Sequence, residues 1–269
     1  MICTDPNSAA GVAGCVSDSA GALLIQPFDL AFKGTYIYIA DRGGDGKFAG
    51  EGFIVRCTIS GLGTASPSLT SCAKVQPASN FDRPYGLELD GSTLYVAGYG
   101  VGSIANTKGV TVCTIDSNYD LVQCSSTFGL LTDGTTAAWV GTRFVRIYNN
   151  TAYVIPDQGN AGIFVCSNPT QLTGCTKRDF TGYDPTTSTN PNTTLSVNTY
   201  WIDFLYAQAY VGGYASSGFV AVCDDPVDFT GCRKLYGCSG ASTPDTVDKG
   251  CTSTNNTLRN TMRAAVYPA

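Results

Sequence analysis

A tyrosine-centred motif returns along the whole chain at nearly constant spacing. Tyr38, Tyr95, Tyr153 and Tyr210 each lie in a short apolar segment, their separations are 57, 58 and 57 residues, and Tyr267 lies another 57 residues further on. Self-similarity at a period of about 50 residues is typical of solenoids and propellers, in which each repeat buries its apolar faces against its neighbours. The chain is therefore expected to fold as an array of similar small units.

Four strand-like segments, named a to d in chain order, make up each repeat. In the second repeat they are residues 85–89, 93–98, 109–115 and 121–124. Asp90-Gly91 separates segment a from segment b, and Asp-Gly between two apolar runs is a strong hairpin signal. Each repeat is therefore expected to form one four-stranded antiparallel sheet.

The repeats predict a single domain with four complete units and a split fifth unit. The complete units span residues 27–79, 80–138, 139–183 and 200–236, loops occupy residues 184–199 and 237–257, and residues 1–26 and 258–269 share the fifth unit. In that unit, segment a is expected at residues 262–266 and segment b has no candidate. Either the chain belongs to a longer protein, or residues 252–258 fold back, or a partner supplies the strand.

The composition agrees with an all-β protein that does not bind nucleic acid. Charged residues make up 14% of the chain, which has 31 glycines, 15 tyrosines and 12 phenylalanines, a mixture that favours short strands joined by tight turns. A net charge of -5 without a basic cluster opposes binding to phosphate backbones and anionic membrane surfaces. The sequence has neither an apolar run long enough to span a bilayer nor a signal-peptide pattern, so a mature or excised form without membrane insertion is expected.

Twelve cysteines fall into close pairs along the sequence. Zinc sites usually have shorter ligand spacings and often histidine, which this chain lacks, so disulfides are the favoured interpretation. Disulfides persist in oxidising compartments, and this predicts a secreted, extracellular protein. The predicted pairs are Cys3/Cys15, Cys57/Cys72, Cys113/Cys124, Cys166/Cys175, Cys223/Cys232 and Cys238/Cys251.

Three Asn-x-Ser/Thr sequons agree with passage through a secretory pathway. They place predicted glycosylation at Asn149, Asn192 and Asn255. Sequons also arise by chance in a chain rich in Asn and Thr. They therefore support the secreted location without establishing it.

Residues 27–41 and 84–98 share the pattern Pro-x-Gly/Asp-Leu-x-x-x-Gly-x-x-x-Tyr-Val/Ile-Ala-Asp/Gly. This pattern resembles the NHL and YVTN families of β-propeller repeats, and the likeness extends over most of the chain. The resemblance implies a β-propeller of four-stranded antiparallel blades, and four complete units with a split fifth then predict a five-bladed β-propeller with the fifth blade built from both chain ends. These families include lyases, lactonases, receptor modules and cell-surface proteins, and the cysteine pairs and the five-unit length are departures from them.

In such a propeller, segment a lies nearest the axis. Alignment on the tyrosines places Ala31, Glu88, Arg146 and Asp203 at equivalent positions, so Glu88, Arg146 and Asp203 are candidate axial ligand-binding residues. The alternative is that these side chains pair with one another and with water in a narrow channel. Arg146 argues against a cation at the axis, and no metal or other cofactor is expected.

The sequence offers little for catalysis. With no histidine to activate a nucleophile and all cysteines assigned to disulfides, histidine-based triads are excluded, and only the Glu88 and Asp203 carboxylates remain for acid–base work. Residues 41–51 faintly resemble a calcium loop but lack the alternating oxygen ligands, so a glycine-rich turn between segments b and c is favoured.

The resulting hypothesis is a non-enzymatic extracellular propeller that acts as a structural, assembly or binding module, with a subunit of a glycosylated polymer or matrix as one form of it. Its expected partners are itself or another extracellular protein, through the fifth blade, and glycans, covalent or bound. A lectin-like propeller is the first alternative, with Tyr99, Tyr183 and Tyr214 as candidate stacking residues that do not repeat in every unit. A lactonase- or lyase-like enzyme is the second.

Overall fold

The structure is a computed structural model of the chain. It describes residues 2–3, 15–16, 23–43, 52–61, 68–75, 81, 83–98, 109–127, 141–156, 162–183, 193–194, 199–213 and 219–236. The contacts define two compact units, residues 1–127 and residues 128–269, and each is described by itself. The single domain stays a prediction.

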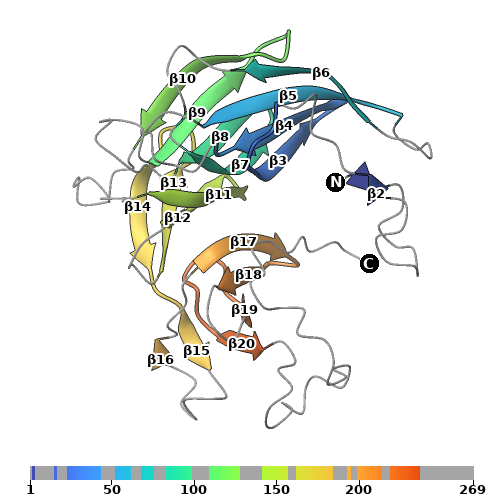
Figure 1. Cartoon of the computed structure of the whole chain (residues 1–269). Coiled ribbons are helices and arrows are strands. Elements are labelled where there is room, and N and C mark those ends of the chain that lie inside the picture. The colour runs from blue at the N-terminus through green and yellow to red at the C-terminus, as the bar shows by residue number, and fades with distance from the viewer. Residues whose placement is uncertain are drawn as a thin grey trace. The chain divides into compact units, whose positions relative to one another are not determined.

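The N-terminal unit holds two four-stranded antiparallel sheets (Figure 1). Blade 1 consists of β3 (Pro27–Lys33), β4 (Tyr36–Asp41), β5 (Phe53–Ser60) and β6 (Ser68–Val75). Blade 2 consists of β7 (Pro84–Asp90), β8 (Thr93–Gly98), β9 (Gly109–Ile115) and β10 (Leu121–Thr127). A separate two-stranded sheet pairs β1 (Ile2–Cys3) with β2 (Cys15–Val16).

The C-terminal unit repeats this arrangement with one addition. Blade 3 consists of β11 (Thr142–Tyr148), β12 (Thr151–Pro156), β13 (Ile163–Asn168) and β14 (Thr173–Arg178). Blade 4 consists of β17 (Thr199–Leu205), β18 (Gln208–Gly213), β19 (Phe219–Cys223) and β20 (Cys232–Tyr236). Two short strands, β15 (Thr181–Tyr183) and β16 (Thr193–Thr194), extend blade 4 to six strands.

Each blade is an up-and-down meander in which strands adjacent in the sequence are hydrogen-bonded neighbours. Within each unit the first strands of the two blades contact each other, β3 with β7 and β11 with β17. This is the architecture of β-propeller blades, and it confirms the predicted all-β, four-stranded antiparallel repeat. The described residues contain no helix, and hence none that is long and apolar enough to cross a membrane.

The described residues form four complete blades, and the only other sheet among them is the β1–β2 pair, which lies within residues 1–26 assigned to the fifth unit. In that pair Cys3 lies opposite Cys15. Residues 258–269, predicted to contain segment a of the fifth unit at residues 262–266, lie outside the described residues, as do residues 237–257 with Cys238 and Cys251. The five-blade count and the closure of a ring stay predictions.

Disulfides join the third and fourth strands of all four blades, between cysteines that are neighbours in the sequence. The bonds are Cys57–Cys72, Cys113–Cys124, Cys166–Cys175 and Cys223–Cys232, with Cα–Cα distances of 3.9 to 4.1 Å. Each closes the hairpin formed by the two outer strands. The blades thus have covalent support at the edge that lies farthest from the neighbouring first strands.

A left-handed residue precedes the second cysteine of every described disulfide. Ser71 and Gln123 have φ of 48°, and Gly174 and Gly231 have φ of 64° and 63°. In blades 1 and 2 the strand register shifts at this point. Glycine adopts this left-handed conformation without the steric cost that other residues bear.

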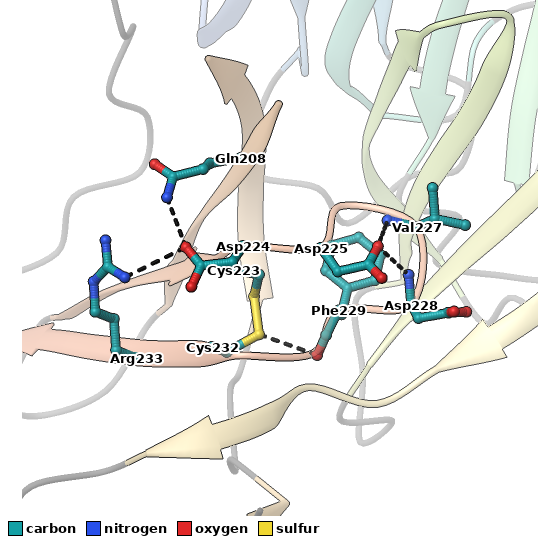
Figure 2. The surroundings of a disulfide bond; sticks show 9 residues. All are labelled: Gln208, Cys223, Asp224, Asp225, Val227, Asp228, Phe229, Cys232 and Arg233. Atoms are coloured by element: carbon teal, nitrogen blue, oxygen red, sulfur yellow. Dashed lines mark hydrogen bonds and ion pairs between the residues drawn. A yellow bond between two sulfur atoms is a disulfide. The ribbon is translucent and has the colours of Figure 1, made fainter. Parts of the chain in front are cut away.

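Polar contacts hold the outer hairpin of blade 4 around its disulfide (Figure 2). Asp225 Oδ1 accepts the backbone N–H groups of Val227 and Asp228 at 2.8 and 3.1 Å and so fixes the turn. Cys232 Sγ lies 3.1 Å from the carbonyl oxygen of Phe229, a fully buried residue of the same turn. The turn therefore presents the Phe229 ring to the protein interior.

The extra strand β15 comes from the connection between blades 3 and 4. It pairs in parallel with β20, with Gly182 opposite Cys232. A Cβ atom at Gly182 would lie 1.7 Å from the Cys232 carbonyl oxygen, so the close approach requires glycine. Residues 181–183, predicted as the end of the third repeat, thus belong to the outer edge of blade 4. Thr193 and Thr194, predicted within a polar loop, pair with β15 in β16.

Introducing glycine at one left-handed position and removing glycine from an equivalent one should change the free energy of unfolding in opposite directions. Gln123→Gly removes the steric cost of φ 48° at an exposed residue and should stabilise the fold by about 0.5–1 kcal/mol. Gly174→Ala should destabilise by at least about 1 kcal/mol, because φ is 64° and the new Cβ would lie 2.4 Å from Ser167 Oγ.

Chemical denaturation of both variants under non-reducing conditions measures the two shifts. Ser125→Gly is the matched control, because Ser125 is exposed on the same strand and has no positive φ, and it should be neutral or destabilising. A destabilised Gln123→Gly variant would contradict the role assigned to this position.

Candidate functional site

The four positions predicted to lie at the axis are directly across from the repeat tyrosines in the strand register. Strand register pairs Ala31 with Tyr38, Glu88 with Tyr95, Arg146 with Tyr153 and Asp203 with Tyr210. Cross-strand partners project from the same side of a sheet. In every described blade, the candidate axial residue therefore shares a face with the repeat tyrosine.

Arg146 and Asp203 lie in the C-terminal unit, and Glu88 lies in the N-terminal unit. Arg146 is buried, and its Nε donates a hydrogen bond to the Ile202 carbonyl oxygen at 3.2 Å, directly before Asp203. Asp203 is half-buried, and its Oδ1 accepts the Phe204 N–H at 3.0 Å. The structure thus brings Arg146 alongside the Asp203 strand. The ligand-binding role of the three residues stays a prediction.

Two of the repeat tyrosines pack on the following blade of their own unit, a role that sequence reasoning did not assign. Tyr38 is fully buried, and its hydroxyl donates to the Tyr119 carbonyl oxygen in the outer turn of blade 2 at 2.7 Å. Tyr153 packs edge-on against Phe229, in the corresponding turn of blade 4, with ring centroids 6.0 Å apart. The regular spacing of these tyrosines was the signal that could have revealed this role.

The same turn of blade 2 receives an ion pair from blade 1. Arg56 donates to the Asn118 carbonyl oxygen at 2.8 Å and to Asp120 Oδ1 at 2.7 Å. Asp116 Oδ1 accepts the N–H groups of Asn118 and Asp120 and so shapes the turn. This turn is a docking point between two blades, and its carboxylates are engaged in that contact.

Burial is the main cause that raises the pKa of Tyr38, Tyr95 and Tyr153 to about 12. All three side chains are almost inaccessible to solvent. Tyr210 differs, because it is only half-buried and its hydroxyl donates to Gln208 Oε1 of its own strand at 3.1 Å. The last described blade therefore lacks the buried tyrosine that the first three have.

The acidic, glycine-rich stretch predicted at residues 41–51 begins with a structural carboxylate. Asp41 is fully buried and accepts backbone N–H groups from Ile25, Gln26 and Gly43 at 2.7 to 3.1 Å. Residues 44–51 lie outside the described residues. Among the residues the structure does describe, no group of three or more acidic or cysteine side chains is arranged to hold a metal ion.

Asn149 is exposed in the two-residue turn between β11 and β12 and has φ of 48°. This position is accessible to a glycosylating enzyme. Asn192 and Asn255 lie outside the described residues, as do Tyr99 and Tyr214. The backbone of Tyr183 belongs to β15, but its side chain is outside the described part of the structure.

No family model and no curated protein matches this chain. Solved structures give distant similarities. Glutaminyl cyclase of Myxococcus xanthus is 11% identical over 82% of each chain, with a TM-score of 0.46. Periplasmic gluconolactonase of Pseudomonas aeruginosa is 16% identical over 78% of this chain and 56% of that one, with a TM-score of 0.46.

An extracellular domain of a two-component system from Bacteroides thetaiotaomicron is 13% identical, with a TM-score of 0.44. The match covers 78% of this chain, which spans only 22% of the length of that protein. Similarities at this level carry no argument about activity. The assignment of the blade architecture rests on the strand topology alone.

The buried tyrosines predict a defined alkaline transition. Because burial raises their folded-state pKa from 10 to about 12, their stabilising effect is complete below pH 10 and is lost as the pH rises towards 12. Tyrosinate absorbance and circular dichroism should show these tyrosines ionising together with unfolding. Tyr38→Phe should weaken the pH dependence, whereas Tyr206→Phe, at an exposed tyrosine, should not. Ionisation of all tyrosines near pH 10 in the folded protein would contradict this assignment.

Proposed function

We propose that this protein is a non-enzymatic extracellular β-propeller that serves as an assembly or binding module. One observation carries the proposal: the residues that recur in each blade contribute to packing. The cysteines close the outer hairpins, and buried Tyr38 and Tyr153 pack on the following blade. The residues opposite the tyrosines differ from blade to blade: they are Ala31, Glu88, Arg146 and Asp203. This variation favours a structural role over a catalytic group that recurs in every blade.

The four disulfides are evidence that the protein resides in an oxidising compartment, and this supports an extracellular or periplasmic location. The exposed sequon at Asn149 adds support for a glycosylated surface. Neither feature requires a catalytic site. Both suit a protein that persists outside the cell.

Blade 1 exposes two apolar side chains of its first strand, and the counterparts of one of them, Leu30, are buried. On the face opposite its tyrosine, Leu30 and Phe32 are 40% and 56% exposed. The residues equivalent to Leu30 in blades 2, 3 and 4 are Leu87, Val145 and Ile202, which are at most 1% exposed. A further blade against this face would bury Leu30 as the repeat pattern requires, and would cover part of Phe32.

Residues 1–26 and 258–269 are proposed to form that fifth blade and to close the ring. We further propose that a second copy of the chain adds a strand to this blade, because an incompletely paired sheet edge is a template for strand addition. Repetition of this contact would yield an extracellular polymer. If another extracellular protein supplies the strand instead of a second copy, the experiment detects that partner.

Size-exclusion chromatography with light scattering tests the assembly. The mass of the intact chain should rise with concentration, whereas a chain lacking residues 1–3 and 262–269, or carrying Leu30→Ser with Phe32→Ser, should stay monomeric. Val227→Ser, at an apolar side chain 53% exposed in the C-terminal unit, is the matched control and should assemble normally. A strictly monomeric intact chain, with no partner recovered from native material, would exclude this proposal.

A further inference from the structure

Two arginines in the N-terminal unit carry buried N–H groups without a hydrogen-bond partner. The two groups are the Nε–H of Arg42 and the Nε–H of Arg83. Arg83 as a whole is only 5% exposed. Within the described ranges, neither guanidinium forms an ion pair with a carboxylate. A buried donor left unpaired costs about 1–3 kcal/mol, and a buried charge without a counter-charge costs more. Such groups call for an acceptor.

The backbone fixes Arg83 at the start of blade 2. Its φ of 48° is uncommon for a residue with a side chain, and it directly precedes Pro84, the first residue of β7. Gly52 packs against this point, since a Cβ there would lie 2.2 Å from Pro84 Cδ and 2.8 Å from the Arg83 nitrogen. Strained backbone conformations that packing imposes are most common at binding and catalytic sites.

Arg42 approaches the same segment from blade 1. Its backbone N–H donates to the Gln26 carbonyl oxygen at 2.9 Å. Its guanidinium lies over the rings of Phe28 and Tyr85, with Cζ 5.8 and 5.6 Å from their centroids, and the two rings are 4.3 Å apart. Tyr85 contacts the Arg42 guanidinium and lies two residues after Arg83 in the sequence.

The two nearby carboxylates of β3 and β4 accept backbone N–H groups. Asp41 binds the N–H groups of Ile25, Gln26 and Gly43, and Asp29 Oδ2 accepts the Leu87 N–H at 2.9 Å. Both carboxylates therefore hold the backbone in place around the arginines. Fixed backbone at Arg83 and Pro84 thus lies next in the sequence to Tyr85, which forms a cluster with Phe28 and the Arg42 guanidinium.

We propose that this corner, formed by Phe28, Arg42, Arg83 and Tyr85, binds a carboxylate-bearing saccharide or sugar acid. A planar guanidinium matches a carboxylate in shape and charge. The half-buried Phe28 ring offers an apolar surface to the carbon skeleton of a sugar, and the buried Tyr85 ring supports it from within. The carboxylate would supply the acceptor that the buried Nε groups lack. This site does not depend on the assembly proposed above, because it uses only described residues of blades 1 and 2.

Titration calorimetry of the full chain tests the site with D-glucuronate, an oligogalacturonate, D-glucose and sulfate. Glucuronate or the oligogalacturonate should bind, and glucose should not. Arg83→Gln and Arg42→Gln should each weaken that binding at least tenfold, and Arg83→Lys should weaken it less than Arg83→Gln. Arg233→Gln, at an exposed arginine in the C-terminal unit that pairs with Asp224 at 3.4 Å, should leave binding unchanged.

Tighter binding of the oligomer than of the monomer, with the same dependence on Arg83, would identify an acidic polysaccharide as the source of the carboxylate. Equal binding of both would identify a free sugar acid. Circular dichroism checks that each variant is folded. If Arg83→Gln does not fold, Arg83→Lys and Arg42→Gln test the site in its place. No binding of either carboxylate, equal binding of glucose or sulfate, or full affinity in the folded arginine variants would overturn the proposal.

Discussion

The contact of a buried tyrosine with the outer turn of the next blade is the interaction on which the rest of each unit depends. A four-stranded blade has two apolar faces and is too thin to bury them by itself, so its stability comes from its neighbours. Tyr38 fills the space between blades 1 and 2 and ends in a hydrogen bond to Tyr119. Tyr153 fills the space between blades 3 and 4 and meets Phe229. Both contacts connect the second strand of one blade to the far hairpin of the next.

This packing requires the outer hairpin to hold its shape, and the disulfides provide that support. They close loops with sequence separations of 9 to 15 residues. In the chain-entropy view, a loop of about 15 residues contributes roughly 3 kcal/mol. In blade 4, Phe229 lies between the two bonded cysteines, and the same hairpin receives Arg178 through an ion pair with Asp228 at 2.9 Å. Covalent closure and contact between blades therefore act on the same residues.

Local patterns predicted the blades well because their causes are local. Asp90-Gly91 marked the first hairpin of blade 2, and its predicted strand at residues 93–98 coincides with β8. The parallel pairing of β15 with β20 could not be predicted, because three residues carry no period and the partner of Gly182 lies 50 positions away at Cys232. The site was harder still. Arg83 is buried, and Gly52, which packs against its backbone, meets it only in the fold, whereas nothing in the sequence around Arg83 distinguishes it from an exposed arginine.

Hydrogen exchange of backbone amides in Tyr38→Leu tests the central claim, that the repeat tyrosine holds consecutive blades together. Replacing the ring and its hydroxyl by a shorter aliphatic side chain should lower protection in β4 and also in residues 116–120, although 81 positions separate Tyr38 from Tyr119. Protection of residues 163–178 in blade 3 should change little. Loss of protection confined to blade 1, with residues 116–120 as protected as in the unaltered protein, would contradict the account.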